Sequence, residues 1–324
     1  MENGHAEPPL QVVVESVGAE ARDAMTFTLA AADGGALPSC APGGHIELAL
    51  PGGLLRHYSL INDCENPDLY MIAVGRAASS RGGSDHIHSQ FREGTQVQVN
   101  AVRNTFRLDP EADAYCFVAG GIGITPIMSM IRWCRRNDRP WRLIYAARSR
   151  QRAAFYEDLC AVGADNVQFH FDDEAGHVLD VGKALAGLAP GEQVYCCGPE
   201  PLMVAVTNVT RDRPAGSVHF EWFTAPEQDP AITADDTELT VDLRRSGVTL
   251  TVPPGRSILE AIEAAGVAHP FSCREGACGT CATTVLEGAP DHRDFVLSDE
   301  ERARNDTMMV CVSRALSGRL VLDI

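Results

Sequence analysis

Three cysteines stand close together near the C-terminus of this 324-residue chain, in the stretch FSCREGACGTC. They are Cys273, Cys278 and Cys281, and the next cysteine along the chain is Cys311. The full set has the spacing C-x4-C-x2-C followed by a distant cysteine, which is the plant-type pattern for a 2Fe-2S cluster. Thiolates are soft ligands that suit iron-sulfur clusters. The sequence therefore predicts that these four cysteines bind a 2Fe-2S cluster.

The two glycines within this loop favour the same interpretation. Gly276 and Gly279 lack a Cβ, so the loop can bend closely around a cluster and point N–H groups at its sulfurs. A tetrahedral zinc site is the alternative, although zinc sites usually combine two C-x2-C knuckles. A plant-type cluster works near about −400 mV and passes one electron at a time. Another part of the chain must therefore supply single electrons.

The other cysteines have no regular spacing, so we do not expect a disulfide framework. We expect them to be small buried hydrophobic residues unless a site uses them. They are Cys40, Cys64, Cys116, Cys134, Cys160, Cys196 and Cys197.

A glycine-rich turn follows a strand-like stretch in AYCFVAGGIGITPIMSMIR. Gly120, Gly121 and Gly123 precede a predicted helix that has Thr125 at its N-cap and Pro126 at its first position. Backbone amides at such a helix start bind anions, such as the pyrophosphate of a dinucleotide. The motif is not G-x-G-x-x-G, so a plain strand-to-helix turn is the alternative.

A second turn follows another buried strand, in YCCGPEPLM. Two such turns at the same end of a parallel sheet define the crevice where ligands bind in open α/β folds.

Two stretches in the first third could hold a phosphate and a ring system. Arg56 of RHYSL, together with Arg81 and the helix start at Gly82, Gly83 and Ser84, could bind a phosphate. The aromatic side chain of Tyr58 could pack against a ring. A buried barrel tyrosine and a solvated arginine are the alternative.

The elements that must position these residues fall into three groups. Six short strands and a helix near 84–91 predict an antiparallel barrel. The strands are expected at 10–18, 24–30, 44–50, 55–61, 68–74 and 95–101. From about residue 114 strands alternate with helices, which predicts a parallel sheet covered by helices. The strands are expected at 114–120, 141–147, 167–171 and 193–198, and the helices at 126–136, 151–162, 179–187 and 200–211.

The stretch TAPEQDPAITADDT has no periodicity and is typical of a linker. We therefore predict a multidomain protein with an antiparallel β-barrel domain, an α/β parallel-sheet domain, and an α+β, β-grasp-like domain that contains the cysteine loop. The expected boundaries are 1–107, 108–226, a linker at 227–237, and 238–324.

The formal charge of −17 argues against binding to nucleic acid or to an anionic membrane surface. No run of 18 apolar residues and no signal peptide is present in the sequence, so we expect a cytoplasmic protein. We also expect a monomer.

Five motifs in order, RHYSL, GGIGITP, CCGPEPLM, HFEWF and the plant-type cysteines, resemble the phthalate dioxygenase reductase family, which includes vanillate demethylase reductases. The resemblance covers essentially the whole chain. It implies an N-terminal FMN-binding barrel, a central NADH domain and a C-terminal ferredoxin domain.

The resemblance also implies roles for individual residues. The flavin contacts are Arg56, His57, Tyr58 and Ser59, with Ser59 near the redox-active edge of the ring. The residues near the FMN phosphate are Arg81, Gly82, Gly83 and Ser84. The residues near the NADH pyrophosphate and nicotinamide are Gly120, Gly121, Gly123, Thr125, Cys197, Gly198 and Pro199. Glu221 and Phe223 match a segment that resembles a lid against the flavin, and a plain edge strand is the alternative. We expect Ser59, Cys197, Glu221 and Phe223 to act in catalysis.

The sequence indicates the preference between NADH and NADPH less directly. An NAD site often places an acid after the second strand, whereas YAARSRQR offers Arg148, Arg150 and Arg152, which could hold the 2′-phosphate of NADPH. The resemblance favours NADH, with Arg148 and either Asp172 or Asp173 near the adenosine part.

We therefore expect a reductase that passes electrons from NADH through FMN and the 2Fe-2S cluster to a terminal oxygenase, most simply of the Rieske type. A reductase for a haem monooxygenase, a redox-sensing regulatory protein and a ferredoxin with structural domains are the alternatives. Acidic residues of the last module could form a docking face for a basic partner, or a merely solvated surface. They are Glu275, Asp291, Asp294, Asp299, Glu300 and Glu301.

Overall fold

The computed structural model describes residues 9–62, 67–76, 82–162, 164–225, 232–233 and 236–324. Arg81 and Cys64, which the sequence singled out, lie outside these residues, as does most of the expected linker. The chain divides into two compact units, Met1–Glu221 and Trp222–Ile324. The first unit contains the barrel and the parallel sheet, each with its own hydrophobic core, and the second contains the cysteine loop.

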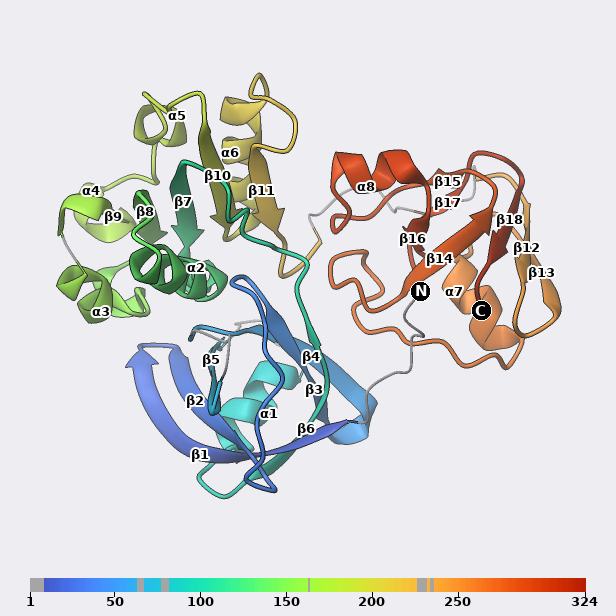
Figure 1. The fold of residues 1–324 in the computed structure, drawn as a ribbon, viewed down its shortest axis with the longest axis horizontal. Coiled ribbons are helices and arrows are strands. Elements are labelled where there is room, and N and C mark those ends of the chain that lie inside the picture. Colours follow the sequence, from blue (N-terminus) through green and yellow to red (C-terminus); the bar gives the residue numbers. More distant parts are fainter. Residues whose placement is uncertain (1–8, 63–66, 77–81, 163, 226–231, 234–235) are drawn as a thin grey trace. The chain divides into compact units, whose positions relative to one another are not determined.

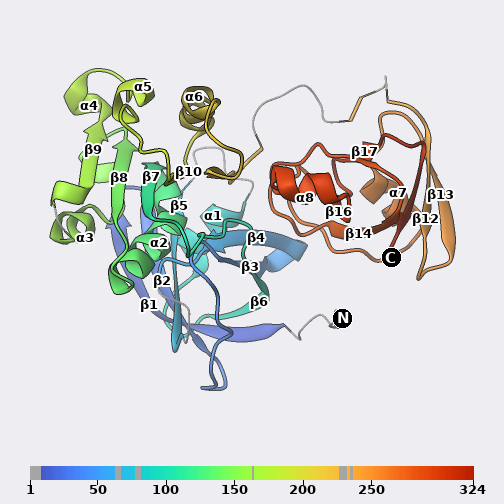
Figure 2. The same cartoon turned by 45° about the horizontal axis from the view of Figure 1, so that its top comes forward.

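The N-terminal sheet of the first unit is antiparallel, with strand order β4-β3-β6-β1-β2-β5 (Figure 1). The two end strands meet through a bridge between Leu60 and Ile72, so the sheet closes into a barrel. Helix α1 (Gly83–Gln90) lies beside β4 and β5 (Figure 2). The strands are β1 (Leu10–Ala21), β2 (Ala24–Ala31), β3 (His45–Leu50), β4 (Leu54–Ser59), β5 (Leu69–Gly75) and β6 (Gln96–Arg103).

The second sheet of this unit is parallel, with strand order β11-β10-β7-β8-β9. Chain order reverses between β7 and β10, and such a reversal is where open α/β sheets bind ligands. The strands are β7 (Ala114–Gly120), β8 (Trp141–Ala147), β9 (Val167–Phe171), β10 (Glu192–Cys197) and β11 (Val218–Glu221). The helices are α2 (Ile124–Arg136), α3 (Tyr156–Ala161), α4 (Asp172–Ala175), α5 (Val181–Ala184) and α6 (Glu200–Thr210).

Three predicted helices of this part differ from the observed ones. Helix α2 begins at Ile124 with Gly123 as its N-cap, so the predicted cap at Thr125 is wrong. The Thr125 hydroxyl donates to the carbonyl of Ile122 at 3.0 Å instead, because the helical turn already starts at the glycines. The predicted helix at 151–162 is confined to α3, since Phe155 takes a left-handed conformation with φ 59°. The predicted helix at 179–187 contains only the four residues of α5.

The second unit is an α+β fold around a five-stranded mixed sheet of order β13-β12-β18-β14-β16. Helix α7 (Ile258–Ala264) packs its apolar residues into the same core, and Ser257 with Glu260 forms a capping box at its start. The other elements are β12 (Leu239–Leu243), β13 (Val248–Val252), β14 (Ala282–Glu287), β15 (Pro290–Asp291), α8 (Asp299–Arg304), β16 (Thr307–Met309), β17 (Arg314–Ala315) and β18 (Arg319–Leu322).

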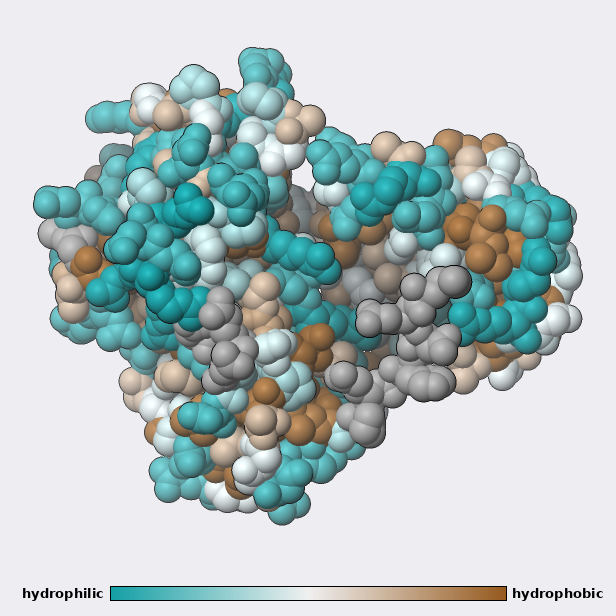
Figure 3. Space-filling view, viewed as in Figure 1, coloured by the Kyte–Doolittle hydropathy of each residue, from teal (hydrophilic) through white to brown (hydrophobic). Residues whose placement is uncertain are grey.

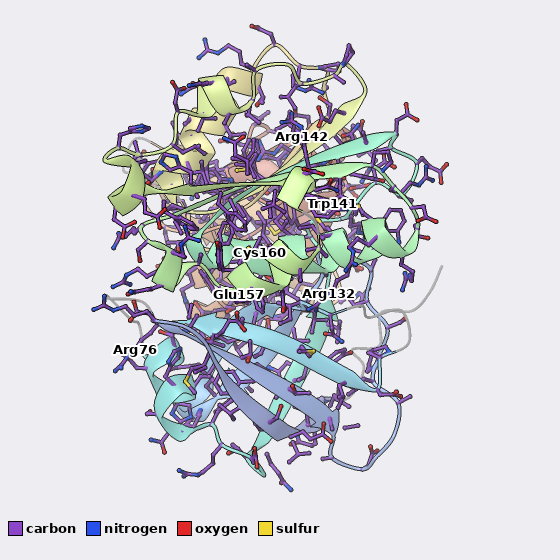
Figure 4. The ribbon with its side chains drawn as sticks, turned by 90° about the vertical axis from the view of Figure 1, so that its left-hand side faces the viewer. Arg76, Arg132, Trp141, Arg142, Glu157 and Cys160 are labelled. Carbon is purple, nitrogen blue, oxygen red and sulfur yellow. The ribbon has the colours of Figure 1, made fainter. Side chains whose placement is uncertain are left out.

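Most of the cysteines with irregular spacing are buried, as the sequence predicted. Cys116, Cys134, Cys196 and Cys197 are fully buried, and the ten cysteines within the described residues are all free thiols. Cys160 is the exception, because it lies exposed on α3 (Figure 4).

Side-chain contacts join the barrel to the α/β part within the first unit. Arg132 on α2 donates to the carbonyl of Ile61, and Figure 4 shows it where the helix meets the barrel. Ile122 of the glycine turn packs against Gly75 at the end of β5. Hydrophilic residues predominate on the face of each unit seen in Figure 3. None of the helices in the described ranges is long and apolar enough to cross a membrane.

Candidate cluster, flavin and nucleotide site

The four predicted cluster ligands come together in the second unit, as two pairs. The Sγ atoms of Cys281 and Cys311 lie 3.2 Å apart. The side chain of Cys278 lies beside that of Cys273 and, with burial, raises the pKa of the Cys273 thiol. Two thiol pairs suit a 2Fe-2S cluster, in which four cysteines serve two irons. The donor set therefore fits the cluster better than tetrahedral zinc.

The loop between these cysteines turns its backbone toward the sulfurs. The amide of Glu275 donates to Cys273 Sγ at 3.3 Å, and the amide of Gly276 donates to the Cys311 sulfur. Three residues of the loop have left-handed backbones: Arg274 (φ 61°), Gly276 (φ 73°) and Gly279 (φ 73°). A Cβ on Gly276 would lie 2.7 Å from Val312 Cγ2. Gly276 is therefore needed both for its conformation and for the close approach of the Cys311 segment.

The loop is anchored on both sides. Arg274 forms hydrogen bonds of 3.0 and 2.6 Å with the carboxylate of Glu263 on α7, and its guanidinium lies 4.1 Å from the centre of the Phe271 ring. The amide of Phe295 donates to the Gly276 carbonyl at 2.9 Å. These contacts hold the cysteine loop against the helix and against the segment that follows β15.

The residues predicted to bind the flavin phosphate come together at the start of α1. A Cβ on Gly83 would lie 2.4 Å from Arg56 Nε, so the arginine side chain lies directly across the backbone of that helix start. Gly82 has a φ of 88°, which lets the chain turn into the helix. A guanidinium beside a helix N-terminus is suited to a phosphate. These residues therefore fit the phosphate end of a bound flavin.

Ser59 and Tyr58 lie at the end of β4. Ser59 is 4% exposed, and burial raises the pKa of Tyr58 to about 12, although the nearby Arg56 lowers it. A neutral tyrosine ring that is partly buried against the barrel core is suited to contact an aromatic ring system.

Glu221 brings the two parts of the first unit together. It ends β11, where it is the register partner of Cys197 on β10. Burial raises the pKa of Glu221 to about 8, and a hydrogen bond with the Ser59 side chain opposes that rise. Burial also raises the pKa of the Cys197 thiol, so it stays protonated at neutral pH. Ser59, Glu221 and Cys197 therefore form one buried polar group between the barrel strand and the parallel sheet.

The raised pKa of Glu221 predicts a pH dependence of stability. Between the ordinary pKa of 4.5 and the folded value of about 8, the folded protein keeps a proton that the unfolded chain releases. The contribution of Glu221 therefore falls as pH rises through this window and is constant above it. We expect Glu221→Gln to flatten this part of the stability profile, as measured by urea unfolding from pH 5 to 9. An equally steep loss of stability in Glu221→Gln would contradict the assignment.

The two glycine turns of the parallel sheet meet at the point where strand order reverses. A Cβ on Gly123 would lie 2.3 Å from the carbonyl oxygen of Cys197. Gly198 is equally constrained, because a Cβ there would lie 3.0 Å from the Gly120 backbone, and Pro199 lies over the same spot. Gly121 has a φ of 53° and its carbonyl accepts a hydrogen bond from Tyr145 Oη at 3.0 Å. The predicted dinucleotide turns are thus packed backbone against backbone.

A polar cavity of 440 Å³ opens at the carboxyl ends of β8 and β9, and it contains the basic residues expected near the adenosine part. Arg150 is held by Glu174 at 3.2 Å and stacks over Tyr156 and Phe171. Arg152 pairs with Asp23. The residues lining the cavity are Arg22, Arg148, Ser149, Arg150, Gln151, Arg152, Asp173 and Glu174.

Some residues that the sequence singled out lie apart from the cluster, flavin and nucleotide groups described above. Asp172 does not line the cavity and lies 3.4 Å from His170 Nε2. Phe223 belongs to the second unit, where its side chain is 46% exposed. Of the expected docking acids, Asp294 is buried, so its inclusion was wrong, and Asp291 pairs with Arg293 at 2.6 Å.

The structure places three residues at these sites that the sequence patterns did not single out. His45 and Glu47 are buried polar residues of β3, and Arg22 lines the nucleotide cavity from the β1–β2 turn. The alternation His-Ile-Glu-Leu at 45–48 was a usable signal, because it predicts a strand with one polar face. Arg22 had no comparable signal.

Comparisons with known proteins agree with this arrangement. A family model of the 2Fe-2S iron-sulfur cluster binding domain matches residues 241–316, and a model of the N-terminal domain of DmmA-like dimethylamine monooxygenase subunits matches 95–216. The toluene-4-sulfonate monooxygenase system reductase subunit of Comamonas testosteroni is 44% identical over 315 residues, with 97% of this chain and 98% of that protein covered.

Two solved structures are also similar. One is a phthalate dioxygenase reductase, described as a modular structure for electron transfer from pyridine nucleotides to 2Fe-2S; it is 40% identical, with a TM-score of 0.70 and 98% of each chain covered. The other is an intact type IV self-sufficient cytochrome P450 monooxygenase, 35% identical with a TM-score of 0.91, of which 43% matches the whole of this chain.

Relatives that are about 40% identical thus match almost the full length of this chain. The chain therefore belongs to the phthalate dioxygenase reductase family of pyridine nucleotide-dependent flavin and iron-sulfur oxidoreductases.

Proposed function

We propose that this protein is the reductase component of a Rieske-type aromatic oxygenase or demethylase, and that it passes electrons from NADH through FMN and the 2Fe-2S cluster to that oxygenase. The observation that carries this proposal is the buried group of Ser59, Glu221 and Cys197, which joins strand β4 of the barrel to the glycine turns of the parallel sheet. FMN, when bound, would accept two electrons with the hydride and release them singly. Ser59 and Glu221 would hold the reacting edge of the ring, and the glycine turns would hold the nucleotide.

The choice of FMN rests on the phosphate corner. Arg56 and the start of α1 together offer one compact anion site, which suits the single terminal phosphate of FMN. Denaturing the purified protein and separating the released flavin by chromatography tests this directly. We expect FMN, and recovery of FAD would overturn the assignment.

The choice of NADH rests on the charges around the nucleotide cavity. The carboxylates of Asp173 and Glu174 line it, and carboxylates suit ribose hydroxyls. Arg150 and Arg152 are already paired with Glu174 and Asp23, so they are less available to a 2′-phosphate.

This charge balance gives a second prediction. Glu174→Gln frees Arg150, so we expect kcat/KM for NADPH to rise by about 10-fold or more relative to NADH, since one charge-assisted hydrogen bond is worth about 1.5–3 kcal/mol. Glu157→Gln on α3 is a matched control outside the cavity (Figure 4). A wild-type protein that already prefers NADPH would contradict the proposal of NADH.

Reconstitution with candidate oxygenases tests which of them accepts electrons from this protein. The purified protein is combined with NADH and either a Rieske-type aromatic oxygenase or a haem monooxygenase, and product formation is measured. We expect turnover with a Rieske-type oxygenase. The match to a self-sufficient P450 monooxygenase makes a haem acceptor the second candidate, and turnover with the haem enzyme alone would favour it.

A further inference from the structure

The turn between β1 and β2 brings the barrel to the nucleotide cavity of the parallel sheet, within the first unit. The hairpin closes at Ala21 and Ala24, which are register partners, so Arg22 and Asp23 form its tip. The carbonyl of Asp23 accepts a hydrogen bond of 2.6 Å from the amide of Arg76, directly after β5. Contacts within the barrel therefore fix the position of this turn.

Two contacts join the hairpin tip to the segment that follows β8. The amide of Arg22 donates to the carbonyl of Gln151 at 2.8 Å, and the carboxylate of Asp23 pairs with Arg152. Only the backbone of Arg22 takes part in these contacts. Its side chain lines the cavity and is not needed to hold the turn in place.

The four arginines that line this cavity differ in whether a carboxylate neutralises them. Two are paired with carboxylates, as described above. The other two, Arg22 and Arg148, are exposed, and no hydrogen bond or ion pair joins either guanidinium to another described residue. Asp173 is the one lining carboxylate that is equally unpaired within the described ranges. The lining therefore has one positive charge in excess, in a chain with a formal charge of −17.

The cavity begins beside the glycine turn at the end of β7. Gly120 is the register partner of Ala146, which lies two residues before Arg148. Tyr145 Oη donates to the Gly121 carbonyl at 3.0 Å, so the end of β8 is held against that turn. A dinucleotide has two phosphates, and the amides at the start of α2 suit one of them. The second phosphate then needs a cation of its own, because an unpaired charge is costly to remove from water.

The charge of the cavity suits one phosphate of a pyrophosphate diester. Each phosphate of that diester has a single negative charge, whereas a phosphate monoester, such as the 2′-phosphate of NADPH, carries about −1.5 to −2 at pH 7. The carboxylate of Asp173 would repel the more highly charged group. A planar guanidinium matches phosphate oxygens with two parallel hydrogen bonds, so an unpaired arginine is suited to this contact.

We propose that Arg22 of the barrel, together with Arg148, binds the adenosine-side phosphate of NADH, an inference that rests on the proposed function. The nucleotide then contacts both the barrel and the parallel sheet. Because Arg22 contacts a part of the nucleotide that does not react, it contributes the same binding free energy before and during hydride transfer. Its removal is expected to raise KM and to leave kcat near the wild-type value.

The first test compares NADH with reduced nicotinamide mononucleotide, which lacks adenosine and its phosphate. Turnover of the holoprotein is measured with cytochrome c as acceptor. We expect Arg22→Gln to raise KM for NADH by about 10-fold or more, the loss typical of one charge-assisted hydrogen bond. Turnover of the mononucleotide should not change. The substitution keeps the amide that bonds Gln151, so the hairpin stays in place. Arg92→Gln, at an exposed arginine of the α1–β6 turn, is the matched control.

The outcomes separate this inference from the proposed function. Equal losses with NADH and with the mononucleotide would show that Arg22→Gln disturbs the joint between barrel and sheet, and would overturn the phosphate contact. An unchanged KM for NADH would overturn it as well, while leaving the proposed function intact. A wild-type protein whose flavin is not reduced by NADH would refute the proposed function itself.

The second test measures binding without turnover. ADP-ribose, which has both phosphates and no nicotinamide, is titrated calorimetrically into the oxidised holoprotein at several salt concentrations. We expect Arg22→Gln to weaken its binding by about 10-fold or more and to reduce the salt dependence, because one charged contact is lost. Adenosine, which has no phosphate, should bind equally to both proteins. A variant that loses affinity for 2′-AMP but not for ADP-ribose would place the guanidinium at the 2′ position and overturn the proposal.

Discussion

Cys311→Ser is expected to remove the 2Fe-2S absorbance of the purified protein and to leave the flavin absorbance. The Cys311 sulfur is 3.2 Å from that of Cys281 and is the only one of the four supplied from outside the 273–281 loop. Serine offers a harder oxygen ligand, which suits iron-sulfur clusters poorly. Reduction of cytochrome c, which needs single electrons from the cluster, is expected to fall to background. Flavin bleaching by NADH should persist, because those residues lie in the first unit.

Cys160→Ser is the matched control for this experiment. Cys160 is an exposed thiol on α3 and takes no part in the cysteine loop. The control should keep the full visible spectrum and the full rate of cytochrome c reduction. An unchanged cluster spectrum in Cys311→Ser would exclude Cys311 as a ligand.

Gly123→Ala is expected to slow flavin reduction by NADH by about 100-fold, the loss typical of a reacting group displaced by about 1 Å. The new Cβ would lie 2.3 Å from the Cys197 carbonyl oxygen and 2.5 Å from its carbon. Both are backbone atoms, so the two turns must move apart rather than a side chain rotating away. Anaerobic stopped-flow absorbance of the flavin measures the effect.

Gly182→Ala provides the same substitution without the crowding. A Cβ at Gly182 would meet only Asp180 Oδ1, at an ordinary distance of 3.5 Å. We expect this control to reduce its flavin at the wild-type rate, with the same cluster and flavin content. A normal rate in Gly123→Ala would mean that the turns tolerate separation and do not position the nucleotide.

The sequence was sufficient to predict most strands of the two sheets in the first unit, and it singled out the four cysteines that the structure brings together. The barrel strands alternate apolar and polar residues, and the strands of the parallel sheet are short apolar runs, so their period and length identify them. The four cysteines are fixed by spacing alone, since the chemistry of the cluster demands that pattern. The pairing of Cys281 with Cys311 follows the same pattern across 30 residues.

Contacts between distant segments could not be predicted in this way. Ser59 and Glu221 meet because the end of β11 lies against the barrel, which no local pattern encodes. The start of α2 was misplaced for a related reason. Local capping preferences favoured Thr125, but the close contact between Gly123 and Cys197 requires the chain to turn earlier. Tertiary packing thus overrode a local preference.

The contact between Gly120 and Gly198 makes the two nucleotide turns interdependent. Each lacks a side chain at the point where the backbones are closest, and Leu202 and Pro199 fill the remaining space. A substitution in one turn therefore changes what the other can accommodate, so the effects of paired substitutions are expected to be far from additive. Efforts to change the nucleotide preference of this protein should leave both turns intact and alter the arginine-lined cavity, where side chains can be exchanged one at a time.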